Sequence, residues 1–525
     1  MKVFLFDTTL RDGTQGEGIS LSVNDKLAIA RKLDFIGIDY IEGGWPFSNP
    51  KDTEFFKIAA QEKWNSKICS FGSTCRVGAK AEDDPNLQAL IDCGAPAAAL
   101  FGKTWDYQVT KTLATDLEEN LRMIFDSIQF LVKKGIEVIF DAEHFFDGYK
   151  ANPDYALKCL EQAEVAGASW LALCDTNGGT LPHDVSETVK ICISKFKTPI
   201  GIHAHNDCEL GVANSLAAVK SGATMVHGTI NGIGERCGNA NLCSVVANLE
   251  LKMNIETSMR NNLKYLTETA RYIAEVANLI LPNHQPYVGS SAFAHKGGMH
   301  ANAVLKNPDT YEHITPEVVG NDRRILMSEL AGTSNLLHKI KELGLPVDDK
   351  ETLRKIIETV KKLEYDGYQF EGADASLELL LYKLLGYFEE HFKIENFKVI
   401  VDKRGREGFT SEAIIKLRIG EEVVHTAAEG NGPVNALDNA LRKALEKSFP
   451  IISDMHLSDY KVRVLEGNYA TASMVRVLIE SKDKYNNWST VGVSPNIIEA
   501  SWQALLDSMN YLLLKEQMKK NGKDF

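Results

Sequence analysis

Two histidines separated by one residue, His203 and His205, are the side chains of this chain best suited to metal chemistry. Alternate residues of a β-strand point to the same face, so both rings should leave one face of a strand together. Neutral imidazole binds many divalent cations. A pair at this spacing is a weak metal signal by itself, and the alternative is two structural histidines that are hydrogen-bonded at a strand end.

A second run, Leu10–Gln15, places the guanidinium of Arg11 beside the carboxylate of Asp12, shortly after the apolar residues Val3–Phe6. Carboxylate oxygens bind Mg²⁺ and Mn²⁺, and an arginine there would bind an anion or stabilise a developing oxyanion. Alternatively, Arg11 is a solvated or ion-paired surface residue. If the two runs meet, on opposite walls of one cavity, they predict a divalent-metal site whose ligands are Asp12, His203, His205 and the amide oxygen of Asn239.

Short apolar strands must position these residues, and eight of them alternate with amphipathic helices up to about residue 255. They are predicted at Val3–Phe6, Ile38–Glu42, Ile68–Phe71, Ala97–Phe101, Glu137–Asp141, Trp170–Cys174, Ile200–His205 and Met225–Ile230. Eight strand-then-helix units in this length favour a (β/α)₈ TIM barrel. An open doubly wound sheet is the alternative, because periodicity does not show closure.

A barrel of this kind carries its functional residues at the carboxyl ends of its strands. Polar side chains do follow the predicted strands: Arg11 and Asp12 the first, Glu143 and His144 the fifth, Asp175 and Thr176 the sixth, His203 and His205 the seventh, and Asn239 the eighth. Glu143 is placed to act as a general base or to support a neighbouring group. The glycines 232, 234 and 238 after the last strand fit a phosphate-binding loop and a tight turn equally well.

The remainder of the chain predicts two further regions, after a catalytic barrel at residues 1–265. Residues 266–390 look mainly helical, except for 294–302, whose glycines and histidines are not typical of a helix face. Residues 391–525 look like a duplicated βββα unit, with helices expected at about 433–449 and 495–514. A duplicated module without catalytic-looking polar clusters favours regulation or oligomerisation.

Composition limits the class of protein. The 525 residues carry a formal net charge of −13, which argues against nucleic acid or an anionic membrane as a partner. Nine cysteines without a C-x-x-C pair are typical of reduced thiols in a cytosolic protein. We find no signal-peptide pattern and no apolar run of the roughly 18 residues that cross a bilayer, so the expected location is cytoplasmic.

Several motifs resemble those of the acyl-CoA-condensing synthases, the family of 2-isopropylmalate, homocitrate and citramalate synthases. They are Leu10–Gln15 with Lys26, His203–Asp207 with Gly211 and Ala213, Gly234–Ala240, and Glu429–Val434 in the duplicated region. Together they cover essentially the whole chain. The run Phe140–Gly148 resembles the citramalate subgroup, and departures from the common pattern at Thr14 and at Cys208–Glu209 spare the motif ligands.

The resemblance implies condensation of acetyl-CoA with pyruvate to (R)-citramalate and CoA, in isoleucine biosynthesis. It implies that Mg²⁺, Mn²⁺ or Zn²⁺ is the metal, that Arg11 stabilises the carbonyl oxygen and that Thr176 binds the keto-acid carboxylate. Glu143 paired with His300 would be the base, with Tyr311 nearby. In this family the segment carrying His300 closes over the partner's barrel, which implies a homodimer.

The resemblance also implies a C-terminal allosteric domain that binds an end-product amino acid, here isoleucine. Three alternatives stay open. The first is a sister synthase that uses 2-oxoisovalerate or 2-oxoglutarate. The second is a metal-dependent acyl-CoA lyase, although such lyases lack the duplicated C-terminal region. The third is a non-catalytic amino-acid sensor, against which Asp12, both histidines and Glu143 argue.

Overall fold

The structure is a computed structural model that describes residues 2–296, 298–326, 339–347, 350–403, 409–465, 473–484 and 486–520. It divides into two compact units. The first comprises Met1–Phe293 with Glu312–Arg323, and the second comprises Ala294–Tyr311 with Arg324–Phe525. The boundaries predicted at residues 265 and 390 stay predictions.

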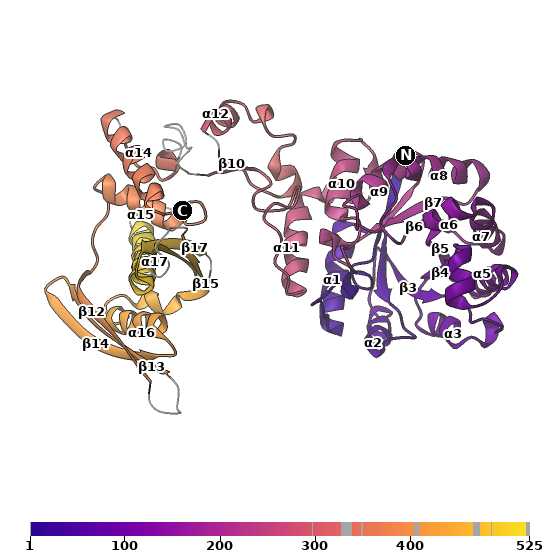
Figure 1. Cartoon of the computed structure of the whole chain (residues 1–525), viewed down its shortest axis with the longest axis horizontal. Helices are drawn as coiled ribbons and strands as arrows, with labels where there is room; N and C mark the ends of the chain where they lie inside the picture. The colour runs from indigo at the N-terminus through magenta and orange to yellow at the C-terminus, as the bar shows by residue number, and fades with distance from the viewer. Residues whose placement is uncertain are drawn as a thin grey trace. The chain divides into compact units, whose positions relative to one another are not determined.

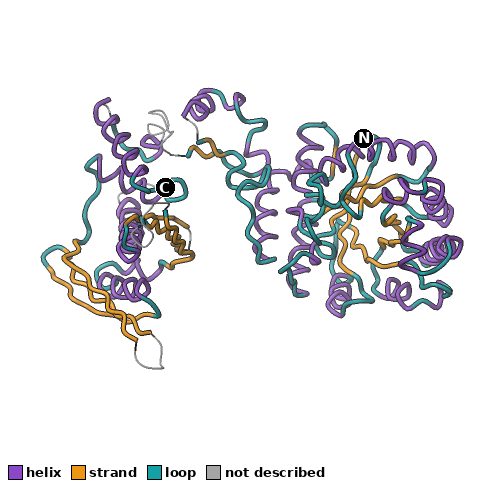
Figure 2. Tube along the Cα trace, in the orientation of Figure 1, coloured by secondary structure: helices purple, strands orange, loops and turns teal. Residues whose placement is uncertain are grey.

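The first unit is a closed parallel barrel, as predicted, rather than an open sheet (Figures 1 and 2). Its strands are β1 (Lys2–Asp7), β2 (Tyr40–Gly44), β3 (Lys67–Ser73), β4 (Ala97–Lys103), β5 (Glu137–Glu143), β6 (Trp170–Asp175), β7 (Ile200–Ala204) and β8 (Met225–Gly228). Each strand pairs with the next, and β1 closes the ring by pairing with both β2 and β8. A short β9 (Glu256–Thr257) adds to the start of β1.

Helices surround the barrel and follow the strands in order. They are α1 (Val23–Ile36), α2 (Pro50–Ala59), α3 (Pro85–Asp92), α4 (Asp106–Gln108), α5 (Leu117–Lys133), α6 (Phe145–Ala151), α7 (Pro153–Ala166), α8 (Pro182–Lys195), α9 (Gly211–Lys220), α10 (Leu242–Leu251) and α11 (Leu266–Val276). Local sequence sets their ends: Ser22 and Asp25 form a capping box on α1, and Gly37 ends it in the left-handed conformation.

Burial on both faces explains why the strands are near-continuous apolar runs. All six residues of β6 are buried, and so are all five of β7. One cluster of buried residues fills the space between strands and helices, and a smaller one that includes Phe6, Tyr40 and Met225 is formed by strand residues alone. The packed barrel is therefore a rigid support for the side chains that follow the strands.

The second unit begins with a short parallel pair, β10 (Ala294–His295) and β11 (Arg324–Ile325). Between them, α12 (Gly298–Lys306) forms a helix where the sequence predicted none. Among residues 299–306, only Ala301 and Val304 are almost fully buried, so the sequence shows no periodic apolar face there. Gly297, within the predicted segment, lies outside the described residues. The helices α14 (Lys350–Tyr365) and α15 (Asp374–Leu384) follow.

The predicted duplication is confirmed. The strands β12 (Lys393–Lys403), β13 (Phe409–Ile419) and β14 (Glu422–Gly430) precede α16 (Pro433–Leu445), and β15 (His456–Val464), β16 (Val475–Lys482) and β17 (Asn487–Ser494) precede α17 (Ile497–Lys520). Both sheets are antiparallel and carry a register shift near the start of the first strand, at Ile394/Asn396 and at Leu457/Asp459. Buried residues of both repeats form one core with α14 and α15. Among the described residues, no helix has the length and apolar character that crossing a membrane requires.

Candidate active site

A cavity of about 390 Å³ opens at the carboxyl ends of the barrel strands. Its walls include Arg11, Asp12, Glu143, Thr176, His203 and His205, which are six of the seven barrel residues to which the sequence analysis assigns a role. The seventh, Asn239, contacts His203. The fold therefore brings the two motif runs together. They do not face each other from opposite walls, as predicted, because only β8 separates β1 from β7.

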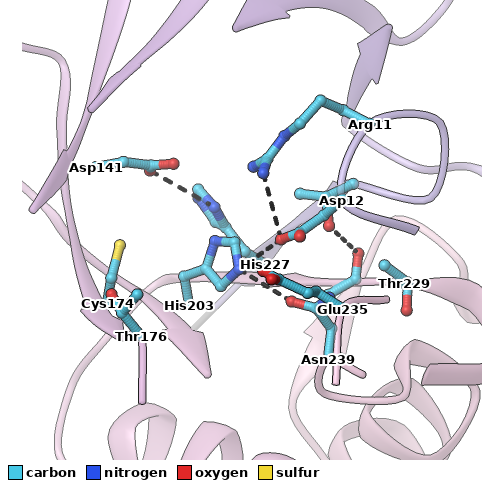
Figure 3. A network of polar contacts seen from close by, with 12 residues as sticks. Arg11, Asp12, Asp141, Cys174, Thr176, His203, His227, Thr229, Glu235 and Asn239 are labelled. Carbon is cyan, nitrogen blue, oxygen red and sulfur yellow. Dashed lines mark hydrogen bonds and ion pairs between the residues drawn. The ribbon is translucent and has the colours of Figure 1, made fainter. Parts of the chain in front are cut away.

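Two of the predicted metal ligands, Asp12 and Asn239, approach Nε2 of a third, His203 (Figure 3). The carboxylate Oδ2 of Asp12 lies 3.1 Å from it, and Oδ1 of Asn239 lies 3.0 Å from it. The rings of His203 and His205 stack 5.2 Å apart, so both leave the same face of the strand, as predicted. Ligand atoms of Asp12, His203 and His205 all lie within 4.8 Å of one another.

This geometry fits a divalent cation. Adjacent ligands of an octahedral ion with bonds of about 2.1 Å are about 3.0 Å apart, which is the spacing of Asp12 and Asn239 from His203. The Nδ1 atoms of His203 and His205 are buried and have no hydrogen-bond partner among the described residues. A mixed set of imidazole, carboxylate and amide oxygen suits Mg²⁺, Mn²⁺ or Zn²⁺. The donor set does not by itself choose between them.

Burial and neighbouring charges shift the pKa values of three predicted ligands. Burial favours the neutral acid of Asp12, but Arg11 and the histidines hold its pKa well below the ordinary value. Burial, together with the neighbouring His203, lowers the pKa of His205 to about 4, so this ring is neutral at physiological pH. Burial alone would lower the pKa of His203. The hydrogen bond and the charge of Asp12 have a larger combined effect, so the pKa of His203 is raised.

A tight turn after β8 places Asn239 in the site. The residues on either side of Asn239 are hydrogen-bonded to the end of β7: Asn206 N donates to Gly238 O, and Ala240 N donates to Ala204 O, each over 2.9 Å. Gly238 has φ +85°, and a Cβ added there would lie 1.9 Å from the carbonyl oxygen of Gly232. The close backbone approach accounts for the glycine at this position, so the structure favours the tight turn over a phosphate-binding loop.

Arg11 is held from three sides and is not the surface residue of the alternative interpretation. Its Nε donates to Oε2 of Glu42 at 2.6 Å, its guanidinium lies 3.8 Å from the ring centroid of Phe71, and one terminal nitrogen lies 3.5 Å from Asp12. Glu42 is fully buried, and burial raises its pKa to about 7 despite the opposing charge of Arg11. The guanidinium is thus fixed at the edge of the metal-ligand cluster.

Glu143 ends β5 and forms an ion pair with Lys103, which ends β4. The carboxylate lines the cavity. Thr176 also lines it, and its hydroxyl accepts a hydrogen bond of 2.8 Å from the backbone N–H of His144. His144 itself adopts the left-handed conformation and its ring contacts Trp105 and Asp147 rather than the ligands.

Sequence reasoning missed four charged or polar groups around the cavity: Glu42, Lys103, Asp141 and His227. Asp141 Oδ1 lies 3.7 Å from Nδ1 of the buried His227, and burial raises the pKa of Asp141 to about 6. Asp141, Cys174 and His203 form a second group whose ligand atoms lie within 4.8 Å of one another. Strand alternation was an available signal, because Asp141 and Glu143 are two residues apart on one strand and share a face.

The two predicted residues beyond the barrel, His300 and Tyr311, belong to the second unit. Their rings stack with centroids 4.3 Å apart, and both side chains are exposed. The structure therefore brings these two residues together. Their meeting with Glu143 stays a prediction.

Comparisons with known proteins cover most of the chain. Residues 2–273 match the HMGL-like family model, 287–367 match the "homocitrate synthase post-HMGL domain-like" model, and 371–513 match the "LeuA allosteric (dimerisation) domain" model. A protein of Aquifex aeolicus named (R)-citramalate synthase is 54% identical, with 98% of each chain covered. Proteins with the same name from Geobacter sulfurreducens (54% identical, 98% of each chain) and a Synechocystis species (50% identical, 97% of this chain and 96% of that protein) are similarly close.

Proposed function

The chain belongs to the HMGL-like family and, over nearly its whole length, to the (R)-citramalate synthases, and on this premise we propose that it condenses acetyl-CoA with pyruvate. Water then cleaves the thioester, so the products are (R)-citramalate and free CoA. The observation that carries the proposal is the cavity in which Asp12, His203 and His205 lie with Arg11 and Glu143.

We assign the metal to Asp12, His203, His205 and Asn239, and Mg²⁺, Mn²⁺ or Zn²⁺ fits this donor set. When bound, the cation supplies Lewis-acid polarisation of the keto acid. The fixed guanidinium of Arg11 supports negative charge on the carbonyl oxygen, since charge-assisted hydrogen bonds are strongest where the donor is already in place. The hydroxyl of Thr176 donates to the keto-acid carboxylate while its oxygen accepts from His144.

Proton removal from the acetyl methyl group needs a base, because thioester α-protons are weak acids. Glu143 takes this role in the proposal, and its carboxylate forms an ion pair with Lys103. The family resemblance adds His300, with Tyr311 beside it, to complete the base. The resulting enolate attacks the ketone carbon of pyruvate and forms the new carbon–carbon bond.

The assembly and regulation follow from the remainder of the chain. We divide it into a catalytic barrel (1–265), a helical linker (266–390) and a regulatory region (391–525). The match to the LeuA allosteric (dimerisation) model supports a homodimer formed through the last region. Isoleucine, the end product of the expected pathway, is the proposed allosteric inhibitor of the enzyme.

A thiol-release assay with acetyl-CoA and each of pyruvate, 2-oxoisovalerate and 2-oxoglutarate tests the proposal. All nine cysteines are free, and Cys208 and Cys237 are exposed, so a blank without acetyl-CoA must subtract the thiols of the protein itself. We expect CoA release with pyruvate at least about tenfold faster than with the larger acids, and inhibition by isoleucine. Equal or faster release with a larger acid would assign a sister synthase instead.

A further inference from the structure

Lys103 lies directly beside Glu143 on the neighbouring strand. In the parallel pairing of β4 with β5, the two residues are register partners at the carboxyl ends of both strands. Their side chains form an ion pair in which the lysine is 15% exposed and the glutamate 23% exposed. The lysine nitrogen also lies 5.7 Å from the ring centroid of Phe101, another residue that lines the cavity.

The backbone on both sides of this pair is held in place. Thr104 donates from its amide (3.2 Å) and from its hydroxyl (2.7 Å) to the carbonyl oxygen of Glu143. The next amide, that of His144, donates to the hydroxyl oxygen of Thr176, which directly follows the other neighbouring strand, β6. The side-chain amide of Asn120 donates to the carbonyl oxygen of Lys103 at 2.8 Å. The carboxylate is therefore the end of a short side chain on a fixed backbone, and its remaining freedom lies in its own torsions.

We propose that Lys103 is a positioning residue that holds the Glu143 carboxylate aimed for proton abstraction. The inference deepens the proposed function and rests on it. One carboxylate oxygen is engaged by the ammonium group, which leaves the other to face the substrate. A partly buried charge pair is screened less than one in open solvent, so the orientation is maintained. Misplacement of a catalytic group by about 1 Å costs about 100-fold in rate.

The proton balance of the step is simple. A C–H bond of the acetyl methyl group breaks, its electron pair remains on the substrate as the enolate, and the proton forms an O–H bond on Glu143. Lys103 keeps all its protons and transfers none. The benefit of the pair therefore lies in the geometry of the carboxylate.

A matched pair elsewhere in the barrel separates this role from structural support. At the opposite end of β5, Glu137 is 23% exposed, like Glu143, and pairs with Lys67 at 2.5 Å. Lys67 begins β3, far along the strands from the cavity. K67M therefore removes a lysine–glutamate pair from the same barrel without touching the cavity, and K103R keeps the positive charge at the site.

The test compares wild type, K103M, K103R and K67M in steady-state kinetics with whichever 2-oxo acid the wild type turns over fastest. For K103M we expect kcat to fall about 10- to 100-fold with KM for the 2-oxo acid within about twofold. The deuterium isotope effect on kcat with methyl-deuterated acetyl-CoA should rise, because proton abstraction becomes slower than the other steps. K103R should recover most of the loss, and K67M should match wild type.

An unchanged kcat in K103M would overturn the proposal, and so would a loss of kcat without a change in the isotope effect, which would indicate general structural damage. Thermal unfolding of each variant identifies a variant that fails to fold. Crystal structures of K103M and wild type need no turnover: the Glu143 carboxylate should change its torsion in K103M, and an unmoved carboxylate contradicts the role. A wild type inactive with all three 2-oxo acids would instead refute the proposed function.

Discussion

The two ends of strand β5 carry the same chemical pair in different surroundings. At the amino end, Glu137 pairs with Lys67 and also accepts a hydrogen bond of 2.8 Å from Tyr40. At the carboxyl end, Glu143 pairs with Lys103 on the wall of the cavity that holds the metal-ligand cluster. A lysine–glutamate pair is therefore no mark of function by itself. What distinguishes the carboxyl end is the set of predicted metal-ligand side chains that follow the other strands.

The same contrast holds for buried acids. The carboxyl end of the barrel contains Asp7, Glu42 and Asp141, all almost fully buried, and burial raises the pKa of each. At the amino end, the acid of β5 keeps contact with solvent. Buried acids cost stability, and their concentration at one end is typical of functional sites.

Removal of the metal should have the largest effect on activity of all the changes that separate the two ends of the barrel, because the polar groups at the carboxyl end surround the predicted ligands. A chelator, or H203A, should lower activity by about 1000-fold or more, since Lewis-acid stabilisation is worth several kcal/mol. Added Mg²⁺ or Mn²⁺ should restore the chelated wild type but not H203A. H183A, which changes an exposed histidine of α8, is the control. Full activity after exhaustive chelation would contradict a metal-dependent site.

The next largest effect should come from exchanging the two glutamates of β5 for glutamine. E143Q should lower kcat by about 100- to 10,000-fold, because the amide cannot accept the proton, while metal affinity measured by calorimetry stays unchanged. E137Q should leave kcat within about twofold. Thiol release measures both variants. Similar kinetics for E143Q and E137Q would remove the functional distinction between the two ends.

A smaller effect is expected from replacing two glycines that both have positive φ, one at the site and one away from it. Gly238 has φ +85° and closes the turn that holds Asn239, whereas Gly94 has φ +72° in the loop before β4 and open space around it. G238A forces a contact with the Gly232 carbonyl, which accepts a hydrogen bond from Asn239 N. We expect about 10- to 100-fold weaker metal binding. G94A should cost about 1–2 kcal/mol of stability with no change in metal affinity, and equal affinities in both variants would contradict the account.

The smallest expected effect concerns pH and stability. Burial raises the pKa of Asp7 from 3.8 to about 7. The folded state therefore binds more protons than the unfolded state between about pH 4 and pH 7, and its unfolding free energy falls as pH rises through that window. D7N lacks this titrating group, so its unfolding free energy should fall less with pH. The difference in unfolding free energy between D7N and wild type should therefore shift in favour of D7N by on the order of 1–4 kcal/mol from pH 4 to pH 8. Denaturant unfolding at several pH values measures it, and a pH-independent difference would argue against a buried neutral acid.

The sequence predicted the barrel because local signals were sufficient. Every strand was a short apolar run, and eight strand-then-helix units favoured a barrel, although periodicity alone left an open sheet as the alternative. The meeting of Asp12 with His203 and His205 was predictable because the two histidines are at alternate positions at the end of one strand and Asp12 follows another. The duplicated βββα region was visible for the same reason: each repeat has its own strand and helix signals.

Pairs that depend on register across strands were not predictable. Lys103 meets Glu143, and Arg11 meets Glu42, because the pairing and register of neighbouring strands set which side chains at their ends lie together. The helix α12 was missed because so few of its residues are buried. The predicted meeting of His300 with Glu143 stays a prediction, because the two residues belong to different units.

The most direct test of the central claim is the position of a metal ion at the carboxyl end of the barrel. Crystals soaked in Mn²⁺ would locate it by anomalous scattering. We predict a peak at about 2.2 Å from the carboxylate of Asp12 and from the rings of His203 and His205, with Asn239 Oδ1 as a further ligand. A peak held instead by Asp141, Cys174 and His203, or no peak in crystals of active enzyme, would contradict the account.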